Sequence, residues 1–387
     1  MKDQPKIDYQ DLSFFSDWVA EAKKQQELFP MAEPGIETQR KVREVLGFHA
    51  GLESPATVRV DDTWEQDGLV GESISWSVGY GPPTQAWLLK PAGANGPLPG
   101  VIALHDHGAF KYLGKEKIAA GCDIPPKFIE SYWGKYYGGR AFANALAQEG
   151  FAVIVPDTFL WGSRKFPIDV IMPDWIEQAF AGLKGFEFEW SDDDIPDEIE
   201  LYNFAASQHE HLIEKYCRQL GTTMAGVVSH EDRMAVNYLR SRPDVDATRI
   251  GCIGLSGGGA RAALLQATCT HIGAAVVVAM MAAYEYLLDK DMKRHTWMFF
   301  PGSWAKHGDW PDLAACRAPS PLLVQYNLED ELFAVDAMKA ADQRIASHYV
   351  SVECREAYTS EFYPGPHKFD LEMQESAFAW LRRQLDV

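Results

Sequence analysis

Four short apolar runs, each followed by turn residues and then by a helical pattern, constrain the fold of this chain more than any other feature. They lie at 99–104 (PGVIAL), 151–155 (FAVIV), 249–254 (RIGCIG) and 321–326 (PLLVQY). Continuous apolarity is typical of strands that are buried on both faces, and strands that alternate with helices form parallel sheets. The sequence therefore predicts an α/β fold built on a mostly parallel, twisted sheet.

Weaker patterns extend this sheet on both sides. Further strands are expected at 274–279 and 349–356 and, as an antiparallel edge, near 56–62 and 72–89. Helices are expected at 16–26, 38–46, 138–148, 231–241, 258–268 and 370–385. The prediction is a sheet of about eight strands with helices on both faces, to which residues 1–95 contribute N-terminal helices and edge strands.

Three connections, 109–137, 158–222 and 282–316, are longer than a compact α/β unit needs. Each follows the carboxyl end of a predicted strand, where open α/β sheets bind ligands, and long loops in such places are commonly functional lids. All three are aromatic, although most of these rings are expected to pack the insertions against the body; examples are Phe110, Trp161, Trp175, Trp190 and Trp297. Because no repeat or linker divides the chain, residues 1–387 are predicted to form a single domain with a lid insertion at 158–222.

Charge and targeting signals narrow the range of partners. The chain has 36 Lys and Arg against 55 Asp and Glu, a net charge of −19, which disfavours nucleic acid and anionic membranes. The N-terminal segment MKDQPKID carries acidic residues and lacks the apolar run of a signal peptide. The longest apolar stretch, near 272–284, is shorter than the roughly 18 residues that cross a bilayer. We expect a cytoplasmic protein with a small-molecule substrate. The oligomeric state, a homodimer included, stays open.

The six cysteines are scattered and contain no C-x-x-C pair, so we interpret them as reduced thiols that mostly pack in the core. Three clusters of His with Asp or Glu begin at His105, His209 and His230, but none has H-E-x-x-H spacing. We expect no metal and no cofactor. The first cluster is interpreted as shaping a loop at the site, and the other two as solvated or lid positions.

The strongest chemical signal is the segment 254–258 (GLSGG), which fits G-x-S-x-G between a strand and a helix. Glycines two residues on either side of Ser256 allow the tight turn that exposes a nucleophilic hydroxyl at a helix N-terminus, where negative charge is stabilised. Residues 257–262 also fit a dinucleotide-binding pattern. That pattern needs an acidic residue about 20 residues further on, and the segment 276–279 (VVVA) has none.

A serine nucleophile needs a base and an acid, which follow it in this architecture in the order serine, acid, histidine. His367 lies in a rigid loop after the last predicted strand and would take the serine proton. Asp330, after the strand 321–326, is preferred as the acid, with Glu329 and Glu331 as close alternatives.

An oxyanion hole needs two backbone N–H groups. Gly257 is expected to supply one, and Ala109, in the loop after the strand 99–104, is expected to supply the other, with Phe110 as its competitor. His107, Phe110, Trp161 and Trp297 are the predicted substrate contacts.

These motifs resemble the α/β-hydrolase superfamily and, within it, the branch similar to dienelactone hydrolases and acetyl xylan esterases. The segments that carry the resemblance are LHDHGAFKYLGKEK (104–117), RSRPDVDATRIGCIGLSGGG (240–259), APSPLLVQYNLEDELF (318–333) and GPHKF (365–369). The resemblance implies that Ser256, Asp330 and His367 form the triad. Dienelactone hydrolases use cysteine as nucleophile, so their lactone substrate does not carry over, and the Cys and Arg that flank the serine of glucuronoyl esterases are absent here.

The predicted function is that of a serine hydrolase that cleaves a carboxylic ester of a small or medium substrate through an acyl-enzyme. A sugar acetate and an aromatic ester both fit. The alternative within enzymes is a hydrolase or lyase acting on a carbon–carbon or amide bond with the same triad. The alternative outside enzymes is a catalytically silent binding protein on the same fold.

Overall fold

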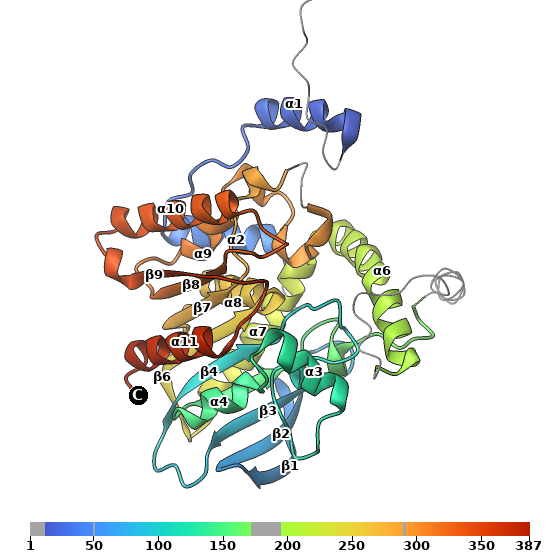
Figure 1. The fold of residues 1–387 in the computed structure, drawn as a ribbon, viewed down its shortest axis with the longest axis vertical. Coiled ribbons are helices and arrows are strands. Elements are labelled where there is room, and N and C mark those ends of the chain that lie inside the picture. The colour runs from blue at the N-terminus through green and yellow to red at the C-terminus, as the bar shows by residue number, and fades with distance from the viewer. Residues whose placement is uncertain (1–11, 49–50, 172–194, 289–291) are drawn as a thin grey trace, which may run out of the picture.

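The structure, a computed structural model, describes residues 12–48, 51–171, 195–288 and 292–387. Within these residues nine strands form one sheet in the order β1-β2-β3-β5-β4-β6-β7-β8-β9 (Figure 1). The pairs β1–β2, β2–β3 and β3–β5 are antiparallel, and the remaining pairs are parallel. The strands are β1 (Ala56–Gln66), β2 (Leu69–Ser77), β3 (Thr84–Pro91), β4 (Leu98–Leu104), β5 (Ala152–Pro156), β6 (Val245–Leu255), β7 (Ala274–Val278), β8 (Leu322–Asn327) and β9 (Tyr358–Tyr363).

Helices cover both faces of the sheet, as predicted. One face packs against α2 (Ile36–Leu46), α7 (Met224–Ser241), α8 (Gly257–Thr268), α9 (Trp310–Ala315) and α10 (Val335–Ser351). The other packs against α3 (Lys127–Tyr136), α4 (Phe142–Gln148) and α11 (Leu371–Gln384). Alternation along β4 explains the two layers, because Ile102 and Leu104 face the first set of helices while Val101 and Ala103 face the second.

Two strand predictions need correction. The segment 72–89 holds the end of β2 and most of β3, because Gly79 and Gly81 adopt left-handed backbone conformations and turn the chain between them. The segment 349–356 is not a strand, since its first residues end α10. Residues of α10 are buried at helical spacing, namely Ala337, Met338, Ala341, Ile345, His348 and Tyr349, and the last strand begins only at Tyr358.

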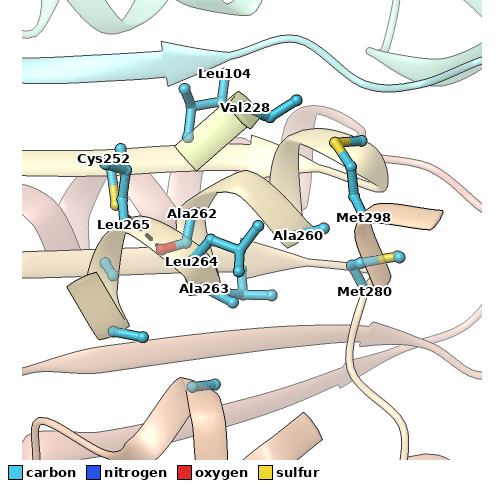
Figure 2. Packing of buried hydrophobic residues seen from close by; sticks show 14 of the residues in the cluster. Leu104, Val228, Cys252, Ala260, Ala262, Ala263, Leu264, Leu265, Met280 and Met298 are labelled. Atoms are coloured by element: carbon cyan, nitrogen blue, oxygen red, sulfur yellow. Dashed lines mark hydrogen bonds between the residues drawn. The ribbon is translucent and has the colours of Figure 1, made fainter. Parts of the chain in front are cut away.

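The helix that follows the candidate nucleophile is buried along its whole length. All residues of α8 are buried, and alanines at positions 260, 262 and 263 let it lie close to the strands beneath it (Figure 2). The Cys252 thiol of β6 donates to the Ala262 carbonyl, and Met280 and Met298 pack near its N-terminal half (Figure 2). Small side chains therefore allow this helix to be the centre of the core.

The three long connections contain structure of their own. The first includes α3, the second α6 (Asp197–Gln219), and the third several short 3-10 helices and α9. Trp175 and Trp190 lie outside the described residues. No helix among the described residues is both long and apolar enough to cross a bilayer.

Candidate active site

Ser256 occupies a tight turn between β6 and α8. Its φ of 57° and ψ of −122° are strained for a residue with a side chain, at a typical cost of about 1–3 kcal/mol. The flanking glycines permit this turn. A Cβ atom on Gly254 would lie 2.4 Å from the Gly258 carbonyl carbon, and one on Gly258 would lie 2.1 Å from the Leu104 oxygen. The partly exposed hydroxyl therefore stands at the N-terminus of α8, where the helix dipole favours negative charge.

His367 and Asp330 form a hydrogen-bonded pair. His367 Nδ1 lies 2.6 Å from Asp330 Oδ2, and the Asp330 side chain is fully buried. Asp330 Oδ1 accepts a hydrogen bond from the Leu332 N–H. Since a carboxylate accepts the Nδ1 proton, the other ring nitrogen, Nε2, keeps a lone pair with which it can act as a base. Glu329 and Glu331, the alternative acids, are exposed.

The loops that carry this pair are joined to each other. The Leu328 N–H donates to the Tyr363 carbonyl, and the Glu329 N–H donates to the Gly365 carbonyl. In addition, Asn327 Oδ1 accepts from the Lys368 N–H at 3.1 Å. These bonds hold the loops after β8 and β9 side by side and so orient the imidazole relative to the buried carboxylate.

Ser256, Asp330 and His367 follow β6, β8 and β9, whose carboxyl ends share one edge of the parallel sheet. Among the described residues, no hydrogen bond joins Ser256 Oγ to His367. Bonds of this kind are often long in proteins without substrate and tighten when substrate binds. The close approach of these two side chains stays a prediction.

The predicted oxyanion loop follows β4. The Ala109 N–H donates to His107 Nδ1 at 3.0 Å, and the N–H of Phe110, its competitor, donates to the His107 carbonyl at 3.1 Å. His107 also lies against the turn of the nucleophile, since a Cβ on Gly257 would be 2.5 Å from its backbone nitrogen. The loop thus reaches the N-terminus of α8, with the Ala109 amide held by a neighbouring imidazole.

The aromatic residues predicted to touch substrate are packed to different degrees. Trp161 is buried, with its ring edge-to-face against His107 and its Nε1–H donating to the His107 carbonyl. Phe110 is buried against Phe128. Trp297 is partly exposed and donates its Nε1–H to the ring of His211. Trp161 and Phe110 therefore support the loop. Trp297 lies partly exposed against His211 and Arg218, and its contact with substrate stays a prediction.

The clusters that begin at His209 and His230 are not solvated at their carboxylates. The first lies in α6, within the segment 158–222 predicted as a lid, and the second lies in α7. Glu210 is buried against Lys111, Glu231 against Arg164, and Asp232 against Arg261. These ion pairs join the insertion helix α6 and the helix α7 to segments around the site. Adjacent residues on a helix point to different faces, and each of these three carboxylates lies on a face that contacts a buried Lys or Arg.

Two more buried groups lie near the site, Asp106 of the cluster that begins at His105 and His295. The Asp106 carboxylate accepts hydrogen bonds from the hydroxyls of Tyr132 and Tyr137. Burial acts to raise its pKa, but Lys117 and the two hydroxyls outweigh burial and lower it. Burial lowers the pKa of His295 to about 4, and its ring stacks on Phe333 near Asp330 and His367. No sequence motif distinguished His295, because its surroundings depend on residues distant in the sequence.

A cavity of about 280 Å³ lies elsewhere, lined among others by Arg43, Arg233, Thr268 and His271. Thr268 ends the helix that begins beside Ser256. This cavity is therefore separate from the candidate active site.

Known proteins are similar to this chain in sequence. The family model described as the dienelactone hydrolase family matches residues 129–358, which include Ser256 and Asp330. A curated relative, the candidate hydrolase YtaP of Bacillus subtilis (strain 168), is 22% identical over 306 residues, which are 79% of this chain and 84% of that protein.

Solved structures share the fold at low identity. A candidate acetyl xylan esterase from Bacteroides fragilis NCTC 9343 has a TM-score of 0.64 at 16% identity, covering 98% of this chain and 90% of that one. Acetyl xylan esterase 1 from Thermoanaerobacterium sp. JW/SL YS485 has a TM-score of 0.56 at 12% identity, with coverage of 94% and 98%. A glucuronoyl esterase from Solibacter usitatus has a TM-score of 0.56 at 13% identity, with coverage of 89% and 92%.

Proposed function

Since this chain belongs to the dienelactone hydrolase family and has the predicted α/β-hydrolase fold, we propose that it is a serine hydrolase that cleaves carboxylic esters. The observation that carries this proposal is the strained, glycine-flanked Ser256 on the same sheet edge as the His367–Asp330 pair. Acyl transfer requires a nucleophile and an oriented base, and we expect the shared sheet edge to bring the two within reach of each other.

The proposed reaction has two halves. Ser256 Oγ attacks the ester carbonyl while His367 Nε2 takes its proton, and the resulting oxyanion accepts hydrogen bonds from the Gly257 and Ala109 amides. The intermediate collapses with cleavage of the carbonyl–oxygen bond, and His367 returns the proton to the departing alcohol. Water, deprotonated by His367, then attacks the acyl-enzyme, and His367 returns this proton to Ser256 Oγ as the acyl–oxygen bond breaks and the carboxylic acid leaves.

Asp330 would hold the imidazole in the Nδ1–H tautomer and stabilise the imidazolium that forms in each half. Its full burial and its second hydrogen bond, from the Leu332 N–H, leave the carboxylate little freedom to turn away. No cofactor takes part in this scheme.

The test is covalent labelling with a fluorophosphonate, followed by mass spectrometry of the labelled peptide. Wild type is expected to carry the label on Ser256, Ser256→Ala to carry none, and His367→Ala to react far more slowly. Folded wild-type protein that takes no label would contradict the proposal and favour a binding protein on this fold.

The substrate class is best sought among esters of sugars and of aromatic acids. The names of two structural neighbours point to sugar-linked esters, and the partly exposed Trp297 offers a surface for a ring. A hydrolysis panel of acetylated sugars, aromatic esters, longer acyl esters and lactones would rank these classes. Turnover of amides or of carbon–carbon bonds, with no ester cleaved, would favour the alternative reaction.

A further inference from the structure

Glu210 of the insertion helix α6 joins all three long connections. Its Oε2 lies 2.8 Å from Nε2 of His107, which comes just before the first connection. The same oxygen accepts a hydrogen bond from Nζ of Lys111, which lies within that connection. Its Oε1 accepts from Thr296 Oγ1 at 3.1 Å and from the Trp297 N–H at 3.4 Å, both in the third connection. One buried carboxylate therefore holds together the segments around the predicted oxyanion loop.

The hydrogen bonds of His107 fix its protonation. A backbone N–H can only donate, so the bond from Ala109 requires a lone pair on His107 Nδ1. The proton of the neutral ring must then be on Nε2, which donates it to Glu210. Burial acts to raise the pKa of Glu210, but Lys111 and His107 outweigh it and hold that pKa well below its usual range, so the acceptor is ionised.

We propose that Glu210 is a positioning residue for the predicted oxyanion hole, because it holds His107 in the tautomer whose Nδ1 orients the Ala109 amide. This inference rests on the proposed serine hydrolase function. In the resting protein the amide has a neutral acceptor. An oxyanion is a stronger acceptor because it is charged, so it can take or share this hydrogen bond as the tetrahedral intermediate forms.

The His107 tautomer with its proton on Nδ1 is incompatible with the hydrogen bond from the Ala109 N–H. With a proton on Nδ1, two N–H groups would face each other at a distance of 3.0 Å, and the loop would have to rotate. Gly108 and Ala109 are both left-handed, at φ 56° and 51°, so the loop holds its shape through such contacts. The ring is kept from swinging away by Trp161, which lies edge-to-face against it.

Two substitutions at His107 test separately its hydrogen bond from the Ala109 N–H and its hydrogen bond to Glu210. In His107→Asn, the amide oxygen takes the place of Nδ1 and keeps an acceptor for the Ala109 N–H. In His107→Gln, the terminal amide takes the place of Nε2 and keeps the contact with Glu210 but loses that acceptor. We expect kcat of the glutamine variant to fall about 100-fold or more, as for loss of one oxyanion donor. We expect kcat of the asparagine variant to fall less than about 10-fold. KM is expected to change little in both variants. The same exchanges at the exposed His271 serve as controls and are expected to leave kcat unchanged.

Glu210 is tested by removing its buried pair together, as Glu210→Leu with Lys111→Met, so that no ammonium is left unpaired. Folding is checked by the unfolding transition. We expect the Glu210→Leu/Lys111→Met change to lower kcat about 100-fold when His107 is present and less than about 3-fold when His107 is replaced by asparagine. The reason is that the asparagine oxygen can accept from the Ala109 N–H without a carboxylate to set its tautomer. Equal losses in both backgrounds would overturn the proposal and assign Glu210 a purely structural role.

The tautomer itself is measured without turnover, from the imidazole nitrogen shifts of protein labelled with ¹⁵N-histidine. We expect the Nε2–H form of His107 in wild type and a mixture of forms in the Glu210→Leu/Lys111→Met variant. A pure Nε2–H form in both proteins would refute the role of Glu210 while leaving the serine hydrolase intact. Absence of fluorophosphonate label on Ser256 would instead overturn the proposed function, and this role with it.

Discussion

His367 Nδ1 lies 2.6 Å from a carboxylate oxygen of Asp330, whose side chain is fully buried. The acidic neighbours Glu329 and Glu331 are exposed at the same turn. Burial therefore distinguishes one carboxylate among three adjacent ones, and the buried one is in contact with the imidazole.

Replacement of Asp330 by asparagine is expected to lower kcat by about 10³–10⁴-fold, because an amide can no longer hold the imidazole in its Nδ1–H tautomer. Ester hydrolysis under saturating substrate measures this loss. Glu329→Gln and Glu331→Gln are the matched controls and are expected to keep kcat within about 2-fold, because both side chains are exposed to solvent, which screens their charge. A larger loss in either control would assign the acid to that residue.

Gly258→Ala is expected to disrupt the turn of the nucleophile. Its Cβ would lie 2.1 Å from the Leu104 carbonyl oxygen, so α8 has to shift away from β4. We expect a loss of about 1–3 kcal/mol in the free energy of unfolding, as for overpacked cores, together with a fall in kcat. Denaturant titration checks the first effect. Gly134→Ala in α3, where an added Cβ has no atom within 4 Å, is the control and is expected to be neutral or slightly stabilising.

The buried ion pair between Arg261 of α8 and Asp232 of α7 predicts a non-additive effect on stability. Asp232→Leu leaves a buried guanidinium without its carboxylate, which costs about 3–5 kcal/mol of unfolding free energy. Adding Arg261→Met removes that charge, so the double variant is expected to be more stable than the single one. A double variant that is less stable, measured by urea unfolding, would show that the bonds from Arg261 to the His105 and Pro156 carbonyls matter more than the pair.

His295 predicts an acid-sensitive contribution to stability. Burial lowers its pKa in the folded protein to about 4, against about 6.5 in the unfolded chain. Between these values the unfolded chain binds a proton that the folded protein does not, so the free energy of unfolding falls as the pH falls from 6.5 towards 4. At pH 5 the loss from this residue is on the order of 1–2 kcal/mol.

His295→Phe keeps a ring against Phe333 and removes the titrating group. Stability is measured at pH 7.5 and pH 5 for both proteins, and the variant is expected to lose less between the two. Burial raises the pKa of Asp309 to about 6, which acts in the opposite direction, but this contribution is present in both proteins and cancels in the comparison. Equal losses would mean that His295 is already protonated or solvated in the folded state.

Sequence patterns predicted the parallel strands β4 to β8, because continuous apolarity reports burial on both faces, but they missed β9, whose residues are mostly half-buried. The segment 349–356 failed as a strand since Val350, Val352 and Cys354 alternate only over the end of a helix whose buried face begins at Ala337. A short window of alternation cannot outweigh a longer helical period when the two overlap.

The sequence by itself determined the central parallel strands and the order in which a serine, an acid and a histidine follow one another along the chain, because these depend on local turns and on periods of two or 3.6 residues. Only the tertiary structure decided that Asp330 rather than Glu329 or Glu331 contacts His367, and that Glu210 contacts His107 and Lys111. Such contacts join side chains tens of residues or more apart, and a carboxylate becomes buried only when the folded connections bring its cation or imidazole to it. No local pattern carries that information.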